Sequence, residues 1–138
     1  MSNPARVTLA PDQPDGVLVV EVVPPDRRLV AGLESGPHTQ ATQLGDAVLR
    51  VADQFDWPVV LDLRSVDWID SGACAVLIKF WKELRVKGRV VAMCVTDPVK
   101  ETFRITGLIR LIPCFGELDE AIDAARAAQP PTASGNGA

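Results

Sequence analysis

The alternation of two hydrophobic periods constrains this chain most. From residue 17 to 128, β-branched runs such as VLVVEVV at 17–23 alternate with segments whose apolar residues recur every three or four positions. The runs are typical of strands, and the longer spacing is typical of amphipathic helices. Strands that alternate with helices imply parallel neighbours joined by right-handed crossovers. The order β-β-α-β-α-β-α-β-α therefore predicts a single small α/β layer with a mixed, mostly parallel sheet and about four helices.

The expected sheet begins with an antiparallel pair. Residues 28–33 follow the turn Pro24-Pro25-Asp26 and are expected to return antiparallel beside 17–23. The remaining strands are expected to be parallel, because each is followed by a helical segment. Central strands are expected at 59–63 and 89–95, whose apolar runs are almost unbroken, and an edge strand at 109–115, which tolerates Pro113.

Four helices are expected from spacing and end signals. Helix ends are indicated by the Trp57-Pro58 pair, by Gly88 and by Gly107, and Asp97 and Gly116 are expected to open the last two helices. The helical core stripes are Leu44, Val48, Val51 and Phe55, then Ala73, Leu77, Phe80 and Leu84, then Val99 and Phe103, and finally Leu118, Ala121, Ile122 and Ala125. The residues expected to be buried between sheet and helices are Leu61, Leu63, Leu77, Phe80, Leu84, Val91 and Phe103.

Length and composition predict one domain with loose ends. Residues 1–16 contain three prolines and are expected to be a loosely structured lead-in, with a short strand near 7–10, and 17–128 form the domain. Residues 129–138 have no apolar side chain larger than Ala, so we expect a disordered tail. A net charge of −4 argues against general binding to nucleic acid or anionic lipid. No membrane span or leader peptide is visible, so the cytoplasm is the expected location.

Enzyme motifs are missing from the loop between Asp62 and Ser71, where an open α/β sheet usually carries its site. The chain has no phosphate-binding P-loop and no dinucleotide fingerprint, and Ile69 and Ala73 replace the glycines of a nucleophile elbow around Ser71. The single histidine, His38, is distant in sequence and supplies no adjacent base. These absences predict a protein that is not an enzyme and has no catalytic residues.

Metal and cofactor sites are also not predicted. Asp62, Asp67 and Asp70 are carboxylates of the kind that Mg²⁺ prefers, but such acids are more often turn formers and solvated loop charges. The three cysteines, Cys74, Cys94 and Cys114, form no C-x-x-C pair, so we expect small reduced core residues rather than a zinc site or disulfides.

The segment DWIDSGACAVL, residues 67–77, allows two interpretations of Ser71. In the first, Ser71 is the N-cap of the following helix and contributes about 1 kcal/mol to its stability. In the second, the serine is also exposed enough to be phosphorylated. The charge of about −1.5 to −2 that a phosphate adds would be tolerated by the helix N-terminus while it alters partner binding.

The stretch from 59 to 125 resembles a STAS domain, the fold shared by sulphate-transporter tails and bacterial anti-sigma-factor antagonists. The matching pieces, in order, are the strand VVLDL, the IDS turn, its helix, the strand GRVV, the pattern F-x-x-x-G-L and the closing FGELDEA. The resemblance implies that the unphosphorylated antagonist binds an anti-sigma factor that is a serine kinase. The kinase phosphorylates the serine after the turn aspartate, and a serine phosphatase reverses the mark.

By position, the resemblance assigns phosphorylation to Ser71, and partner binding to Asp70, Ser71, Gly72, Ala73 and Cys74. The family usually has a second small hydroxyl residue and then glycine after the phosphoserine, where this chain has Gly72 and Ala73. Two alternatives stay open: an unphosphorylated scaffold or transporter-associated subunit with the same fold, and a small α/β nucleotide-binding protein or enzyme that uses the Asp62–Ser71 loop. The sigma factor, the kinase, the stimulus and the oligomeric state are not encoded in any motif.

Overall fold

The structure, a computed structural model, describes residues 5–11, 13–14, 16–32, 34, 36–37 and 39–128. The expected disordered tail and His38 lie outside the described residues. Among the described residues, no helix combines the length and the apolar character that crossing a bilayer requires.

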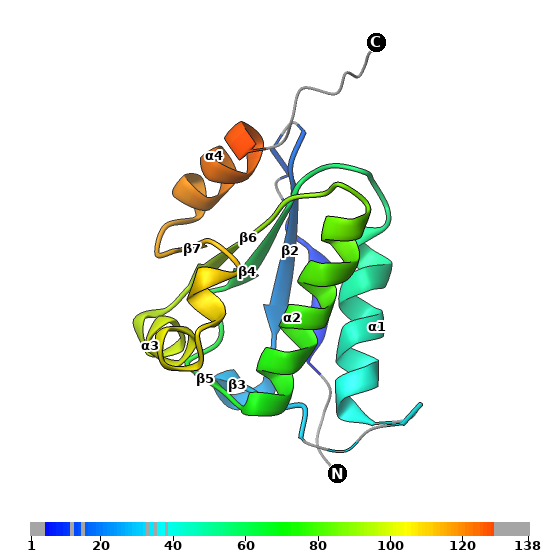
Figure 1. Cartoon of the computed structure of the whole chain (residues 1–138), viewed down its shortest axis with the longest axis vertical. Coiled ribbons are helices and arrows are strands. Elements are labelled where there is room, and N and C mark those ends of the chain that lie inside the picture. Colours follow the sequence, from blue (N-terminus) through cyan, green and yellow to red (C-terminus); the bar gives the residue numbers. More distant parts are fainter. Residues whose placement is uncertain are drawn as a thin grey trace.

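A five-stranded sheet in the order β1-β2-β4-β6-β7 forms the centre of the fold (Figure 1). The edge strand β1 (Arg6–Leu9) runs antiparallel to β2 (Leu18–Val23), and every other pair in this sheet is parallel. The parallel strands continue through β4 (Val59–Leu63), β6 (Val91–Val95) and the short β7 (Cys114–Phe115). The predicted fold class, a mixed and mostly parallel sheet with an antiparallel pair at its start, is confirmed.

The described residues form four α-helices, three of which cover the two faces of this sheet. α1 (Gln40–Ala52) and α2 (Ser71–Val86) lie side by side, and α4 (Leu118–Ala128) lies on the opposite side (Figure 1). The short helix α3 (Asp97–Thr106) packs beside the end of the sheet, and a 3₁₀ turn, η2 (Leu108–Arg110), follows it. Alternate residues along this strand contact different layers. Leu18 and Val20 contact the core under α1 and α2, whereas Val19, and Val17 just before β2, contact the core under α4.

The predicted core is confirmed. All seven residues expected to be buried are buried, and the α2 stripe faces the sheet as its spacing requires. Gly107 has φ of 83°, the left-handed conformation expected of a helix-ending glycine, and Leu108 packs into the core beside it. The registers of the parallel strands are therefore set by apolar residues on both faces of the sheet.

The expected antiparallel partner of β2 is wrong. β2 pairs with β1, whereas β3 (Arg28–Leu29) pairs parallel with β5 (Trp68–Ile69) in a separate two-stranded sheet. The reason lies in the turn η1 (Pro25–Arg27), where Asp26 and Arg27 both adopt positive φ and lead the chain away from the edge of β2. Residues 28–32 thus continue toward the start of α2 instead of returning along β2.

Three smaller expectations are also corrected. α1 ends at Ala52, and Phe55 lies beyond it, half exposed and stacked on Trp57. The N-cap of α3 is Thr96 rather than Asp97, and the Thr96 hydroxyl donates to the carbonyl of Val66 instead of capping the helix. The expected edge strand at 109–115 is reduced to the two residues of β7, because the chain before it turns through η2.

Candidate functional site

The candidate site is the N-terminus of α2, at the carboxyl-end side of the central strands. The chain leaves β4, passes through β5 and enters α2 at Ser71. β5 is held against β3 by their parallel pairing, and the Asp70 amide donates to the carbonyl of Leu29 at 3.1 Å. The first turn of α2 is therefore fixed from two sides, by β5 before it and by β3 beside it.

Asp70, not Ser71, caps this helix. One carboxylate oxygen of Asp70 accepts from the Ala73 amide at 2.7 Å, the contact that defines an N-cap. The same carboxylate accepts from the amides of Ala31, at 3.1 and 3.2 Å, and Gly32, at 2.9 Å. A single side chain thus joins the start of α2 to the segment that follows β3. The interpretation of Ser71 as the cap is wrong, because the preceding aspartate satisfies the helix end.

The Ser71 hydroxyl is left unused by this arrangement. Ser71 is the first residue of α2, and its side chain is exposed. The Ser71 hydroxyl makes no hydrogen bond to any described residue. Asp70 beside it is half-buried. An exposed hydroxyl that the fold does not need, next to a fixed carboxylate, is available for chemical modification or for contact with another molecule.

The next three residues of the site are buried. Gly72, Ala73 and Cys74 face inward, toward β3 and the core. Gly72 is required by the packing: a Cβ atom there would lie 1.8 Å from the carbonyl oxygen of Gly32. The structure therefore brings Ser71 and part of Asp70 to the surface, and a role for Gly72, Ala73 and Cys74 in partner binding stays a prediction.

A groove of about 530 Å³ begins at Ser71 and runs between α1 and α2. Its apolar floor includes Leu49, Val76 and Phe80. Its charged residues are Glu34, Asp46, Lys79 and Glu83. None of these four charged side chains forms an ion pair with another described residue.

The carboxylates near this loop have separate partners instead of forming one cluster. Asp62 is buried and pairs with Arg64 at 2.9 Å, and Asp67 pairs with Arg27 at 2.6 Å. Among the described residues, no group of three or more acidic, histidine or cysteine side chains has the geometry to hold a metal ion. Each acid of the loop therefore already has partners. Asp62 and Asp67 pair with guanidinium groups, and Asp70 accepts hydrogen bonds from backbone amides.

The thiols are poor nucleophiles. Cys74 and Cys94 are buried and Cys114 is half-buried, and all three are free of disulfides, as expected. Burial raises the pKa of each thiol to about 11, and the Asp70 and Asp62 carboxylates contribute at Cys74 and Cys94. Because the reactive form of cysteine is the thiolate, these residues are nearly inert at neutral pH.

The Asp70 contacts predict a pH-dependent loss of stability. Burial by itself would raise the pKa of Asp70, but the amides of Gly32, Ala73 and Ala31 outweigh it and lower the pKa. A carboxylate with a lowered pKa stabilises the fold above the unfolded-state pKa of about 3.9, and this contribution is lost as the pH falls through the folded-state pKa. We expect Asp70→Asn to lower the free energy of unfolding by about 1.5–3 kcal/mol at pH 7, as the loss of charge-assisted hydrogen bonds does.

Denaturant unfolding at several pH values measures this effect. The difference between wild type and Asp70→Asn should shrink below about pH 4, because wild type then loses the same charge. Asp46→Asn is the matched control, since the Asp46 carboxylate is exposed on α1. A difference between wild type and Asp70→Asn that stays constant down to pH 2 would show that the carboxylate charge is not what stabilises this helix start.

Comparisons with known proteins place the chain in a family. The sequence model of the STAS domain matches residues 38–121. BtrV of Bordetella bronchiseptica, named as a candidate anti-sigma factor antagonist, is 31% identical over 107 residues that cover 76% of this chain and 92% of BtrV. The chain therefore belongs to the STAS domain family.

Solved structures share the fold. The crystal structure of an anti-sigma factor antagonist from Mycobacterium paratuberculosis superposes with a TM-score of 0.64 at 24% identity, covering 91% of this chain and 99% of that one. The mouse anion transporter Slc26a9 superposes with a TM-score of 0.66 at 15% identity, over 84% of this chain and 18% of the transporter. At these identities the likeness concerns the fold alone.

Proposed function

We propose that this chain is a non-enzymatic anti-sigma-factor antagonist of the cytoplasm that binds an anti-sigma serine kinase through the surface around Ser71. Phosphorylation of Ser71 by that kinase ends the complex, and a serine phosphatase restores the binding form. The observation that carries the proposal is the division of labour at the helix start, where Asp70 performs the capping and leaves an exposed Ser71 hydroxyl without a structural task. The likeness to BtrV supports the class of partner.

The geometry supports a phosphate at Ser71 that acts on binding and not on folding. The N-terminus of a 16-residue helix favours a negative charge, so the fold tolerates the phosphate. A docked surface that matches a neutral hydroxyl must instead desolvate a group of nearly two negative charges beside the Asp70 carboxylate. The phosphorylated chain is therefore folded but binds weakly.

The non-enzymatic part of the proposal is supported by the chemistry of the Asp62–Ser71 loop. Asp62 and Asp67 are paired with arginines, and the Asp70 carboxylate accepts three backbone amides. None of them is positioned to accept a proton from Ser71, whose hydroxyl has no hydrogen-bond partner among the described residues. Ser71 therefore acts as an acceptor of phosphate from another protein and not as a nucleophile of this chain.

A kinase assay on captured partner tests this function. The purified chain is used as bait in extract of its own cells, a serine kinase is identified in the eluate, and ATP is added before phosphosite mass spectrometry. We expect ATP-dependent phosphate on Ser71 of wild type. Ser65→Ala, which removes the other serine of the same loop, is the matched control and should leave the Ser71 phosphate unchanged.

Two results would contradict the proposal. One is the capture of a kinase that places phosphate elsewhere on the chain while Ser71 stays unmodified. The other is an interaction that is identical before and after ATP treatment, with the kinase shown to be active on a control substrate. The first result would place the modification at another residue. The second would favour an unphosphorylated scaffold or a transporter-associated subunit with the same fold.

A further inference from the structure

The small sheet β3–β5 exposes an unusual pair of side chains. Leu29 and Ile69 are buried opposite each other, so the alternation of strand residues places Arg28, Val30 and Trp68 on the outer face. Trp68 is 45% exposed and Val30 is 44% exposed. The guanidinium carbon of Arg28 lies 4.2 Å from the Trp68 ring centroid, in cation–π contact. We refer to Arg28, Val30 and Trp68 as the β3–β5 ledge.

The turn that precedes the ledge is strained and firmly held. Asp26 and Arg27 have φ of 53° and 57°, a left-handed conformation that is unfavourable for residues with a Cβ atom. The Arg27 guanidinium donates to both Asp67 carboxylate oxygens, at 2.6 and 3.0 Å, and to the Arg64 carbonyl at 2.8 Å. Strain of this kind persists only where the surroundings fix it, and it is concentrated at functional sites.

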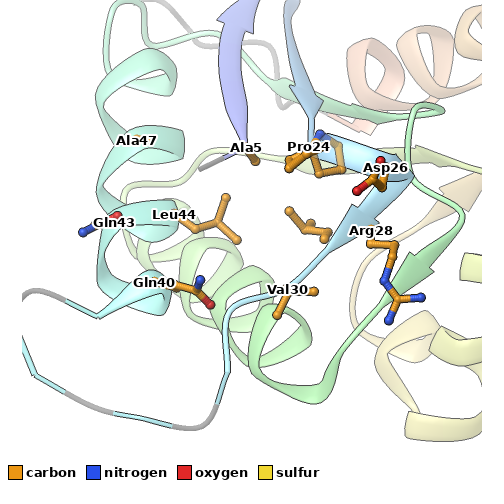
Figure 2. Close-up of a pocket in the computed structure, with 11 residues that line it drawn as sticks. Ala5, Pro24, Asp26, Arg28, Val30, Gln40, Gln43, Leu44 and Ala47 are labelled. Atoms are coloured by element: carbon orange, nitrogen blue, oxygen red, sulfur yellow. The ribbon is translucent and has the colours of Figure 1, made fainter. Parts of the chain in front are cut away.

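A groove of about 260 Å³ lies directly beside the ledge (Figure 2). Figure 2 shows Leu44 of α1 extending toward it from one side, with Pro24 at its upper end and Val30 at its lower end. Ligand pockets for small molecules usually measure about 300–1,000 Å³, so this groove suits an apolar side chain better than a whole cofactor.

The charge at the ledge indicates what kind of partner residue would bind there. Arg28 is exposed and forms no ion pair with any described residue, in a chain whose net charge is −4. Asp26 also lines the groove, and in Figure 2 the Arg28 guanidinium extends away from it. Tryptophan and arginine are the residues that most often dominate the energy of protein interfaces.

We propose that the β3–β5 ledge and its groove bind a partner segment that carries one leucine-sized side chain next to a carboxylate. The apolar side chain enters the groove between Val30 and Leu44, and the carboxylate pairs with Arg28 against Trp68. The inference rests on the proposed function, because it assumes that the molecule bound in the groove is part of a protein. Asp70 accepts from the amides of Ala31 and Gly32, so the ledge is continuous with the surface around Ser71.

Peptide titrations followed by amide and indole NMR test the ledge on the full chain. The probes are Ac-Asp-Leu-Asp-NH₂, Ac-Lys-Leu-Lys-NH₂ and Ac-Asp-Ser-Asp-NH₂, each at millimolar concentration. The acidic leucine peptide should shift the signals of Val30, Leu44 and the Trp68 indole, and the other two peptides should shift them little. Trp68→Ala should weaken its binding about fivefold or more, as the removal of an interface hot spot does.

A charge reversal makes the test specific. Arg28→Glu should reverse the preference, so that the basic leucine peptide binds better than the acidic one. Arg50→Glu, which changes an exposed arginine on the last turn of α1, makes the same change in net charge and should leave the preference unaltered. The proposal is overturned if the acidic leucine peptide shifts none of these signals. It is equally overturned if Arg28→Glu and Arg50→Glu behave alike. Neither result bears on phosphorylation of Ser71, which the kinase assay decides separately.

Discussion

Gly72→Ala should lower the free energy of unfolding by about 3 kcal/mol or more, at or above the upper end of what overpacking usually costs. The added Cβ would lie 1.8 Å from the carbonyl oxygen and 2.7 Å from the carbonyl carbon of Gly32. The obstacle is backbone that the Asp70 carboxylate holds through the amides of Ala31 and Gly32, so no flexible side chain can move aside. The first turn of α2 would have to separate from the segment after β3.

Gly45→Ala is the matched control for this substitution. Gly45 lies within α1, and a Cβ there would meet nothing closer than the Val76 Cγ1 at 3.7 Å, an ordinary contact. Alanine at a helix interior is favoured over glycine by about 0.5–1 kcal/mol, so this variant should be slightly more stable than wild type. Denaturant unfolding of both variants measures the contrast. A loss below about 0.5 kcal/mol for Gly72→Ala would mean that the two backbones do not touch.

Arg89→Met should lower the free energy of unfolding by about 3–5 kcal/mol, because two carbonyls would lose their donor at about 1–3 kcal/mol each and the packing of the side chain would change as well. The Arg89 side chain is 3% exposed. Its guanidinium donates to the carbonyl of Ala52 at 2.9 Å and to that of Trp57 at 2.8 and 3.1 Å. It thereby satisfies the carboxyl end of α1, where a cation also complements the helix dipole.

The electrostatics of Arg89 agree with this structural role. Burial lowers the pKa of Arg89, and Asp53 and Asp56 partly offset that effect, so the guanidinium stays charged at neutral pH. Arg89→Lys keeps the charge but lacks the planar fork that serves two carbonyls, so it should lose about half as much stability as Arg89→Met. Equal stability of Arg89→Met and wild type would show that water satisfies these carbonyls without the guanidinium.

The order of elements was predictable because apolar periodicity records burial directly. β4 and β6 are buried along their whole length, and α2 presents a continuous apolar stripe, so both patterns are explicit in the sequence. The partner of β2 was not predictable in the same way. Aspartate tolerates a left-handed conformation, but arginine does not favour it, and Arg27 is held there by contacts with Asp67 that the local sequence does not reveal.

The place of Asp70 and Ser71 at a helix start was predicted, but not which of the two caps the helix. The sequence indicated that an aspartate and a serine lie at a helix start, and both residue types are good N-caps. A shift of the helix start by one residue decides which of the two is the cap. Local sequence rarely fixes a helix end to within one residue. The packing of Gly72 on Gly32 was also invisible, because it joins two segments 40 residues apart.

Because Asp70 caps α2, substitutions of Ser71 are expected to have little effect on the stability of the fold. Because the Ser71 hydroxyl bonds no described residue, Ser71→Ala should alter the free energy of unfolding by less than about 0.5 kcal/mol. Ser71→Asp places an acid in the first helical turn, where the dipole favours it, so it should also melt close to wild type. Both variants are therefore folded proteins with altered surfaces, and any change in their partner binding reports on the interface.

The most direct test of the proposed switch is the affinity of the anti-sigma kinase for wild type, Ser71→Ala and Ser71→Asp, measured by titration calorimetry without ATP. Ser71→Ala should bind as wild type does, since in the proposed switch the unmodified surface is the binding form. Ser71→Asp should bind about tenfold or more weakly, because a desolvated charge at an interface costs at least about 1.4 kcal/mol. Equal affinity of Ser71→Asp and wild type, with all three proteins folded, would contradict the switch at Ser71.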